Sequence, residues 1–161
     1  MANDLNPKRR SGFGLAVIAL AVTGVIGFEG TSLRPYEDPV RVNTICMGET
    51  DRDVVAMGTL TLQQCTAVLG ASLQEHASHV APCISRPVRR NEAAAILSWS
   101  YNIGATAACK STLIRKLNDG AQAVDWCDEI KRWTYAGGKQ LPGLVARRES
   151  EYRMCTTGVW K

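Results

Sequence analysis

The sequence has 161 residues, of which 45% are hydrophobic and 21% charged, with six cysteines and a formal net charge of +4. A chain of this length can bury one core of ordinary size, split into two lobes joined by a helix. The cysteine spacings exclude a typical zinc site, because there is no C-x-x-C pair and His76 and His79 lie far from any cysteine pair. Disulfides in an oxidising compartment explain the cysteines better.

The positive charge is modest, and it fits some attraction to the peptide carboxylates of cell-wall glycans. Nucleic-acid binding is disfavoured, because the arginines are scattered without a stacking aromatic pattern or a binding motif. We expect most of these charges to lie on solvent-exposed faces: Arg86, Arg89, Arg90, Arg147 and Arg148.

The chain begins with a polar stretch followed by an apolar run from Gly12 to Phe28. Lys8, Arg9 and Arg10 precede this run, and such a positive flank predicts a cytoplasmic N-terminus with the rest of the chain exported. The run is at the short limit for a membrane-spanning helix, and several Gly and Ala residues dilute its hydrophobicity. Three interpretations compete here: a cleaved signal peptide, a permanent anchor, and a weak anchor that later leaves the bilayer.

Two carboxyl side chains and a hydroxyl follow the apolar run, at Glu29, Asp38 and Thr44. Glycoside hydrolysis needs one carboxyl to protonate the leaving oxygen and a second polar site on the other face of the sugar. Glu29 ends an apolar segment, which favours a protonated acid, whereas Asp38 lies in a polar turn, which favours an ionised carboxylate. The pattern predicts a hydrolase site in which the two carboxyls divide the roles.

Residues 31–50 are expected to form a small lobe of turns and short strands, with Pro35, Pro39 and Gly48 as its turn residues. Thr61 and Gln64 then fit a capping box, and apolar residues recur at three and four positions up to Val80. This pattern predicts an amphipathic helix that Pro82 ends and that links the two lobes. We expect His76 and His79 to be ordinary residues of this helix rather than catalytic bases.

A mostly helical lobe is predicted for the rest of the chain. The predicted helices cover Ala93 to Tyr101, Ser111 to about Asn118, Ala121 to Trp133, and Pro142 to about Met154. Residues 134–143 are rich in Gly and are expected to form a flexible loop, either structural or in contact with a glycan. We expect the large aromatic side chains of this lobe to belong to the core rather than to sugar platforms: Trp99, Trp126 and Trp133.

Several motifs carry a resemblance to a known family. The first is Glu29-Gly30-x-x-Leu33-Arg34-x-Tyr36-x-Asp38, followed by Thr44-Ile45-x-x-Gly48. Later blocks are Tyr101-Asn102-Ile103-Gly104, the segment from Ser111 to Lys116, and the segment from Arg132 to Lys139. From about residue 13 to Cys155 the chain resembles the phage-type, T4-like lysozymes, and most closely their signal-anchor-release endolysins.

The resemblance implies an α+β, mainly helical fold: a two-lobed lysozyme-like domain with a small β-containing cleft lobe and a helical C-terminal lobe. Its catalytic Glu, Asp and Thr correspond to Glu29, Asp38 and Thr44. Glycan-cleft positions correspond to Tyr101, Asn102 and Thr112. The sequence departs from the family at Arg41, where Gly is common, and at Asn43, where an aromatic residue is usual, so the local turn geometry is in question.

In these lysozymes the catalytic Glu lies at the end of the first helix, so the anchor and the catalytic helix are expected to be one element. We therefore divide the chain into a cytoplasmic flank and releasable anchor, residues 1–28, and a catalytic domain, residues 29–161. The anchor is expected to join the domain after release. This predicts a protein of the host inner membrane that later enters the periplasm.

Six cysteines allow fifteen pairings, and the sequence alone does not choose among them. The resemblance implies the pairs Cys46–Cys65, Cys83–Cys109 and Cys127–Cys155, with one or more free thiols as the alternative.

The predicted function is hydrolysis of the β-1,4 bond between N-acetylmuramic acid and N-acetylglucosamine in peptidoglycan, for host cell lysis. No metal or cofactor is implied, and we expect a monomer. Two alternatives remain open. A lytic transglycosylase would cut the same bond without water, and a noncatalytic, membrane-tethered protein would only bind the wall.

Overall fold

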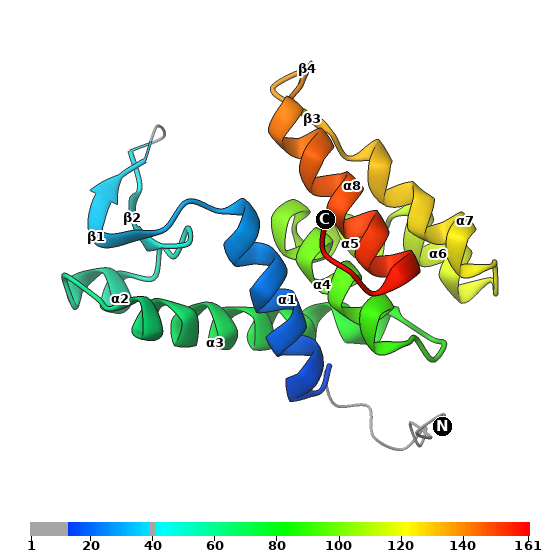
Figure 1. Ribbon diagram of the computed structural model, residues 1–161, viewed down its shortest axis with the longest axis horizontal. Coiled ribbons are helices and arrows are strands. Elements are labelled where there is room, and N and C mark those ends of the chain that lie inside the picture. The colour runs from blue at the N-terminus through cyan, green and yellow to red at the C-terminus, as the bar shows by residue number, and fades with distance from the viewer. Residues whose placement is uncertain (1–12, 39–40) are drawn as a thin grey trace.

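Helices make up most of the fold, and two short antiparallel sheets lie at its edges, so the expected mainly helical α+β class is confirmed (Figure 1). The computed structural model describes residues 13–38 and 41–161. The predicted positive flank at Lys8, Arg9 and Arg10, and the turn residue Pro39, lie outside the described residues.

The first helix, α1 (Leu15–Phe28), lies between the two lobes (Figure 1). One face is buried and consists of Ile18, Ala21, Gly24 and Val25. Ile18 and Val25 belong to the hydrophobic cluster of the smaller lobe, while Val17 packs against the clusters of both lobes. α1 therefore joins the two cores. Among the described residues, no helix is long and apolar enough to cross a membrane.

The smaller lobe contains β1 (Ser32–Glu37), β2 (Asn43–Cys46) and α2 (Arg52–Ala56). The strands are antiparallel, with Tyr36 opposite Thr44 and Glu37 opposite Asn43, and the register shifts between Ser32 and Tyr36. The expected short strands and the turn at Gly48 are confirmed, whereas Pro35, expected in a turn, lies within β1. The five-residue helix α2 was not predicted from the sequence. Asp51 caps its N-terminus, where its side chain accepts hydrogen bonds from two backbone amides.

The long helix α3 (Leu62–Val80) runs from the smaller lobe to the helical lobe (Figure 1). It starts with the predicted capping box, in which Thr61 and Gln64 exchange side-chain-to-backbone hydrogen bonds. It ends in η1 (Ala81–Cys83), because Pro82 lacks the amide hydrogen that would continue the α-helix. Both predicted ends of this helix are confirmed.

Five α-helices and a small hairpin form the helical lobe. In chain order its elements are α4 (Arg90–Ile103), α5 (Ala105–Cys109), α6 (Thr112–Asn118), α7 (Ala123–Asp128), η2 (Glu129–Arg132), β3 (Tyr135–Ala136), β4 (Lys139–Gln140) and α8 (Pro142–Thr157). The helix predicted over 121–133 is wrong in extent, because it tightens into a 3-10 helix after Asp128. The segment predicted as a flexible loop forms the β3–β4 hairpin.

The core of the helical lobe contains two of the three tryptophans expected there. Trp99 and Trp126 are buried, and Trp133 packs its edge on Trp99 with ring centroids 5.7 Å apart. These contacts leave Trp133 half-buried, at the border between core and surface.

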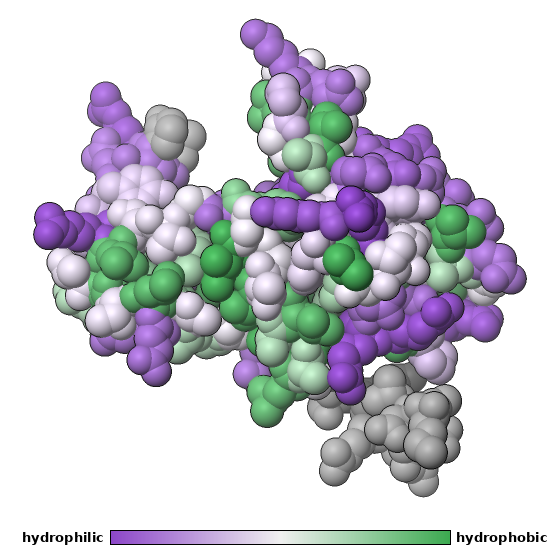
Figure 2. All heavy atoms as spheres, viewed as in Figure 1, coloured by the Kyte–Doolittle hydropathy of each residue, from purple (hydrophilic) through white to green (hydrophobic). Residues whose placement is uncertain are grey.

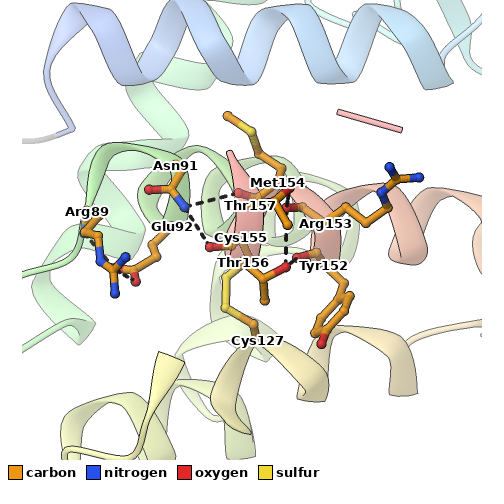
Figure 3. The surroundings of a disulfide bond; sticks show 10 residues. All are labelled: Arg89, Asn91, Glu92, Cys127, Tyr152, Arg153, Met154, Cys155, Thr156 and Thr157. Atoms are coloured by element: carbon orange, nitrogen blue, oxygen red, sulfur yellow. Dashed lines mark hydrogen bonds and ion pairs between the residues drawn. A yellow bond between two sulfur atoms is a disulfide. The ribbon is translucent and has the colours of Figure 1, made fainter. Parts of the chain in front are cut away.

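The six cysteines form three disulfides, Cys46–Cys65, Cys83–Cys109 and Cys127–Cys155, which are the pairs that the resemblance implies. Figure 3 shows the third bond, which joins α7 to α8. Beside it, the Asn91 side chain donates to the carbonyl oxygens of Met154 and Cys155 at the end of α8. One bond therefore lies in the smaller lobe and two in the helical lobe.

Candidate active site

Glu29 is the residue that ends α1, and its side chain is 35% exposed. In Figure 1 this end of α1 lies between the β1–β2 hairpin of one lobe and the β3–β4 hairpin of the other. The Oε1 atom of Glu29 accepts a hydrogen bond of 2.6 Å from Nη1 of Arg147, on α8. The carboxyl is thus fixed at the junction of the lobes by a charge-assisted bond from the helical lobe.

Asp38 opens the turn between β1 and β2. Its amide donates to the carbonyl oxygen of Val42 at 3.0 Å, and the Val42 amide donates back to Oδ1 of Asp38 at 2.9 Å. Arg41 in this turn has a φ of 64°, in the left-handed region that favours glycine. The departure from the family at Arg41 therefore falls where the backbone most needs Gly, at a cost of about 1 kcal/mol.

Thr44 lies on β2, three residues after Arg41, and it is buried. Its Oγ1 donates a 3.0 Å hydrogen bond to the carbonyl oxygen of Val42. Asp38 and Thr44 therefore both bond to Val42, so the two predicted site residues of this hairpin are held by one shared backbone unit.

Arg147 and Arg148 are almost completely buried, so the expectation that they lie on a solvent-exposed face is wrong. Glu151, one turn further along α8, is 0% exposed and accepts from both: from Nε of Arg147 at 3.1 Å and from Nη1 of Arg148 at 2.6 Å. Ser98 on α4 also donates to Glu151, at 2.7 Å. Arg147 thereby connects the half-buried Glu29 to a fully buried, paired carboxylate.

Tyr101 and Asn102 lie near the end of α4, and both interact with this cluster of charges. Asn102 Oδ1 accepts from Nη2 of Arg148. Burial raises the pKa of the Tyr101 hydroxyl, and the nearby carboxylates of Glu49 and Glu29 raise it further, while a hydrogen bond with Ser72 and the charge of Arg147 lower it. These interactions bring Tyr101 into the surroundings of Glu29.

Thr112 lies elsewhere in the helical lobe, at the start of α6. It lines a surface pocket of about 440 Å³, together with Lys110, Glu129, Arg132 and Trp133 among others. Trp133, which lines the same pocket, accepts a hydrogen bond at its carbonyl from Arg148, and Arg148 in turn bonds to Asn102.

Two residues that attach Glu29 to the core, Arg147 and Glu151, were not predicted as part of the site. A signal was present in their spacing. Arg147 and Glu151 are four residues apart, so they lie one above the other on the same helix face, and the segment was predicted to be helical. Glu49 was also missed: its Oε2 accepts a 2.6 Å bond from Ser72, which attaches the end of the smaller lobe to α3.

Within residues 13–38 and 41–161, no three or more His, Cys, Asp or Glu side chains lie close enough together to hold a metal ion.

A sequence model of the phage lysozyme family matches residues 26–151, a range that begins just before Glu29 and ends at Glu151. The chain belongs to this family. It is 39% identical over 151 residues to a SAR-endolysin of bacteriophage PS119, covering 92% of this chain and 90% of that protein. A SAR-endolysin of Enterobacteria phage P21 is also 39% identical, over 150 residues, with 91% and 90% covered.

Solved structures of phage lysozymes have the same fold. An endolysin from Escherichia coli O157:H7 phage FAHEc1 is 29% identical with a TM-score of 0.78, covering 88% of this chain and 94% of that one. A P22 lysozyme is 27% identical with a TM-score of 0.77, covering 85% and 95%. The chain is thus a lysozyme, an endolysin of the phage type that acts on peptidoglycan in lysis.

Proposed function

We propose that this phage lysozyme hydrolyses the β-1,4 bond between N-acetylmuramic acid and N-acetylglucosamine, with Glu29 as the general acid. The observation that carries the proposal is the position of Glu29, at the end of α1 between the hairpins of the two lobes and held by Arg147 (Figure 1). In the reaction, the Glu29 carboxyl gives its proton to the leaving glycosidic oxygen. The guanidinium of Arg147 then stabilises the carboxylate that remains.

Asp38 and Thr44 serve the opposite face of the sugar in this proposal. The Asp38 carboxylate orients a water molecule and stabilises the positive charge that develops at the anomeric carbon. The Thr44 hydroxyl donates to Val42, and its lone pairs remain acceptors for that water. The water adds to the anomeric carbon from the face opposite the leaving group and gives its excess proton to the Asp38 carboxylate, so the configuration inverts.

Tyr101 and Asn102 are the proposed glycan-contacting residues nearest this site. Support comes from the electrostatic coupling of Tyr101 to Glu29 and from the bond between Asn102 and the buried Arg148. Thr112 contacts the glycan further along, at its own pocket on α6.

The test is cleavage of purified peptidoglycan by the wild type and by Glu29→Gln, which removes the proton but keeps the shape. We expect Glu29→Gln to lower kcat about 10²- to 10⁴-fold, because it deletes the general acid. Asp38→Asn is expected to lower kcat as well, and the products are expected to carry one added water. An anhydro product would instead indicate a transglycosylase, and a fully active Glu29→Gln would remove Glu29 from its role.

We also propose that α1 first holds the protein in the host inner membrane. The helix then leaves the bilayer and docks onto the catalytic domain, and the docked enzyme acts in the periplasm. The apolar run that ends in Glu29 supports this, because the helix that would leave the bilayer is the one that joins both cores. While α1 is in the membrane, Glu29 is held at the bilayer surface without its partner on α8.

Fractionation of expressing cells over time, with the intact mass measured in each fraction, separates the three fates of the N-terminal run. Release predicts that the full-length mass moves from the membrane pellet to the soluble periplasmic fraction. A cleaved signal peptide would give a shorter soluble chain. A permanent anchor would leave the full-length mass in the pellet, and either of these outcomes would overturn the release proposal.

A further inference from the structure

We infer that Trp160 is the docking point for α1 and a positioning residue for Glu29. This inference rests on the proposed function, because it says what holds α1 in place once it has left the bilayer. Trp160 follows the end of α8 and packs against the hydrophobic cluster of the helical lobe. From there it reaches across to α1.

The indole of Trp160 occupies a notch in α1 at Gly24. A Cβ placed on Gly24 would lie 2.5 Å from Cζ2 of Trp160, closer than atoms in contact can approach, so only a glycine leaves room for the ring. One turn earlier, the Leu20 carbonyl oxygen accepts a hydrogen bond of 3.0 Å from Nε1 of Trp160. The contact is therefore fixed by shape at Gly24 and by a directional bond at Leu20.

A short series of side-chain contacts connects this notch to the catalytic carboxyl. Trp160 packs edge-to-face on Phe28, with ring centroids 6.2 Å apart. The guanidinium of Arg147 lies over the Phe28 ring, 5.2 Å from its centroid, and donates to Glu29. Phe28 directly precedes Glu29, so a displaced Trp160 changes the packing of the residue that sets the Glu29 backbone.

The helical lobe holds the segment that carries Trp160. α8 ends at Gly158, whose φ of 80° turns the chain back. The Lys161 amide then donates to Ser150 Oγ on α8 at 2.9 Å. These two features flank Trp160, and neither involves α1. The helical lobe alone therefore holds the indole in the place where α1 docks.

Gly24 thus has two effects that belong to different stages. In the bilayer it lowers the hydrophobicity of the run, and in the docked state it accepts the indole. The contact with Trp160 exists only in the docked state, so it stabilises the active arrangement without affecting insertion.

The test compares Trp160→Ala, Gly24→Ala and the double variant, as full-length protein purified without detergent, on purified peptidoglycan. An added methyl at Gly24 pushes the indole out, so the two single variants remove the same contact. We expect each to lower kcat about tenfold with KM changed less than about twofold, and the double variant to be no worse than the poorer single one. Trp160→Phe, which keeps a ring, is expected to recover part of kcat.

Val159→Ala is the matched control, because Val159 is 54% exposed and precedes Trp160; it is expected to keep wild-type activity. Hydrogen exchange supplies a measurement besides activity: Trp160→Ala should deprotect the amides of α1 while those of α6 stay protected. Losses that multiply in the double variant, or full activity with Trp160→Ala, would overturn the inference. Failure of the proposed function is distinguishable, because then the wild type itself would not cut or Glu29→Gln would.

Discussion

A buried carboxylate shared by two arginines supports the candidate site from within. Glu151 has no exposed surface, and its two oxygens each bond to one guanidinium. Such a cluster is costly to desolvate, and it is strongly destabilising when one partner is removed, because the others are left buried and uncompensated. The position of Glu29 therefore depends on a residue that never meets the substrate.

Replacing Glu151 with Gln is expected to lower the free energy of unfolding by about 3 to 5 kcal/mol, because two buried guanidinium groups lose the carboxylate that they share. Urea unfolding of the purified protein measures the change. Glu149→Gln is the control on the same helix, where the side chain is exposed, and we expect a change within about 0.5 kcal/mol. Equal effects in the two variants would contradict the buried cluster.

His76 makes stability depend on pH. Burial lowers the pKa of its imidazole, the charge of His79 lowers it further, and the contact with Ser100 opposes the shift. The unfolded chain takes up the proton at a higher pH than the folded one. The contribution of neutral His76 to the free energy of unfolding is therefore fully present above the unfolded pKa of about 6.5, and it is lost as the pH falls through the lowered folded pKa.

We expect the urea midpoint to fall between pH 7 and pH 5 by more in the wild type than in His76→Gln, whose amide still reaches Ser100. His79→Gln is the control: His79 is exposed, and burial is the larger cause of the shift, so most of the fall should remain. An identical fall in His76→Gln and the wild type would remove His76 as its source.

At the scale of one element, the two faces of α1 differ in the size of their side chains. The buried face contains Ile18 and Val25, whereas the exposed stripe consists mainly of small residues after Leu15: Ala16, Ala19, Thr23 and Gly27. Figure 2 shows hydrophobic side chains at the lower end of α1, where Leu15 is 79% exposed. A helix that is apolar all round can thus face water, because its exposed side carries little apolar area.

Two variants with the same composition separate the proposed membrane role of α1 from its packing role. Ala19→Leu adds apolar area on the exposed stripe, and Ala21→Leu adds it at a site with 0% exposure. Both should prolong membrane retention equally, because a bilayer surrounds every face of the helix. Only Ala21→Leu should damage the docked protein, by about 1 to 3 kcal/mol of overpacking.

Cell fractionation measures the fraction of each variant that stays in the membrane. Peptidoglycan cleavage by the released protein measures how far overpacking damages the docked enzyme. Equal retention with unequal activity is the expected result. If neither variant changed the membrane-bound fraction, α1 would not be the anchor.

Elements with strong local signals were predictable, and elements held by distant contacts were not. α3 was predicted at both ends, because Thr61, Gln64 and Pro82 determine them locally. The β3–β4 hairpin was missed, because its strands have two residues each and its glycine-rich composition equally suits a loop. Glu29, Asp38 and Thr44 could be proposed from motif spacing, whereas the contact of Arg147 with Glu29 was missed because 118 residues separate them.

On the scale of the whole molecule, two disulfides of similar span test what stabilises the helical lobe. Cys127–Cys155 and Cys83–Cys109 close 28 and 26 residues, so loss of either releases a similar chain entropy, about 3.5 kcal/mol. Cys127 and Cys155 are buried, whereas Cys83 and Cys109 are only partly so.

Double substitution to Ala is therefore expected to cost more at Cys127 and Cys155 than at Cys83 and Cys109, by on the order of 1 kcal/mol, since only the buried pair leaves a cavity. Chemical denaturation of both variants measures the difference. Equal losses would mean that chain entropy alone accounts for the stabilisation.

The contact between Leu20 and Trp160 also imposes an order in time, because 140 residues separate them. A ribosome that adds about 5 to 20 residues per second makes Trp160 roughly 7 to 28 s after Leu20. During that interval α1 exists without its indole partner, while the bilayer is already available as an apolar surface. Under the proposed anchoring, the order of synthesis thus favours insertion before docking.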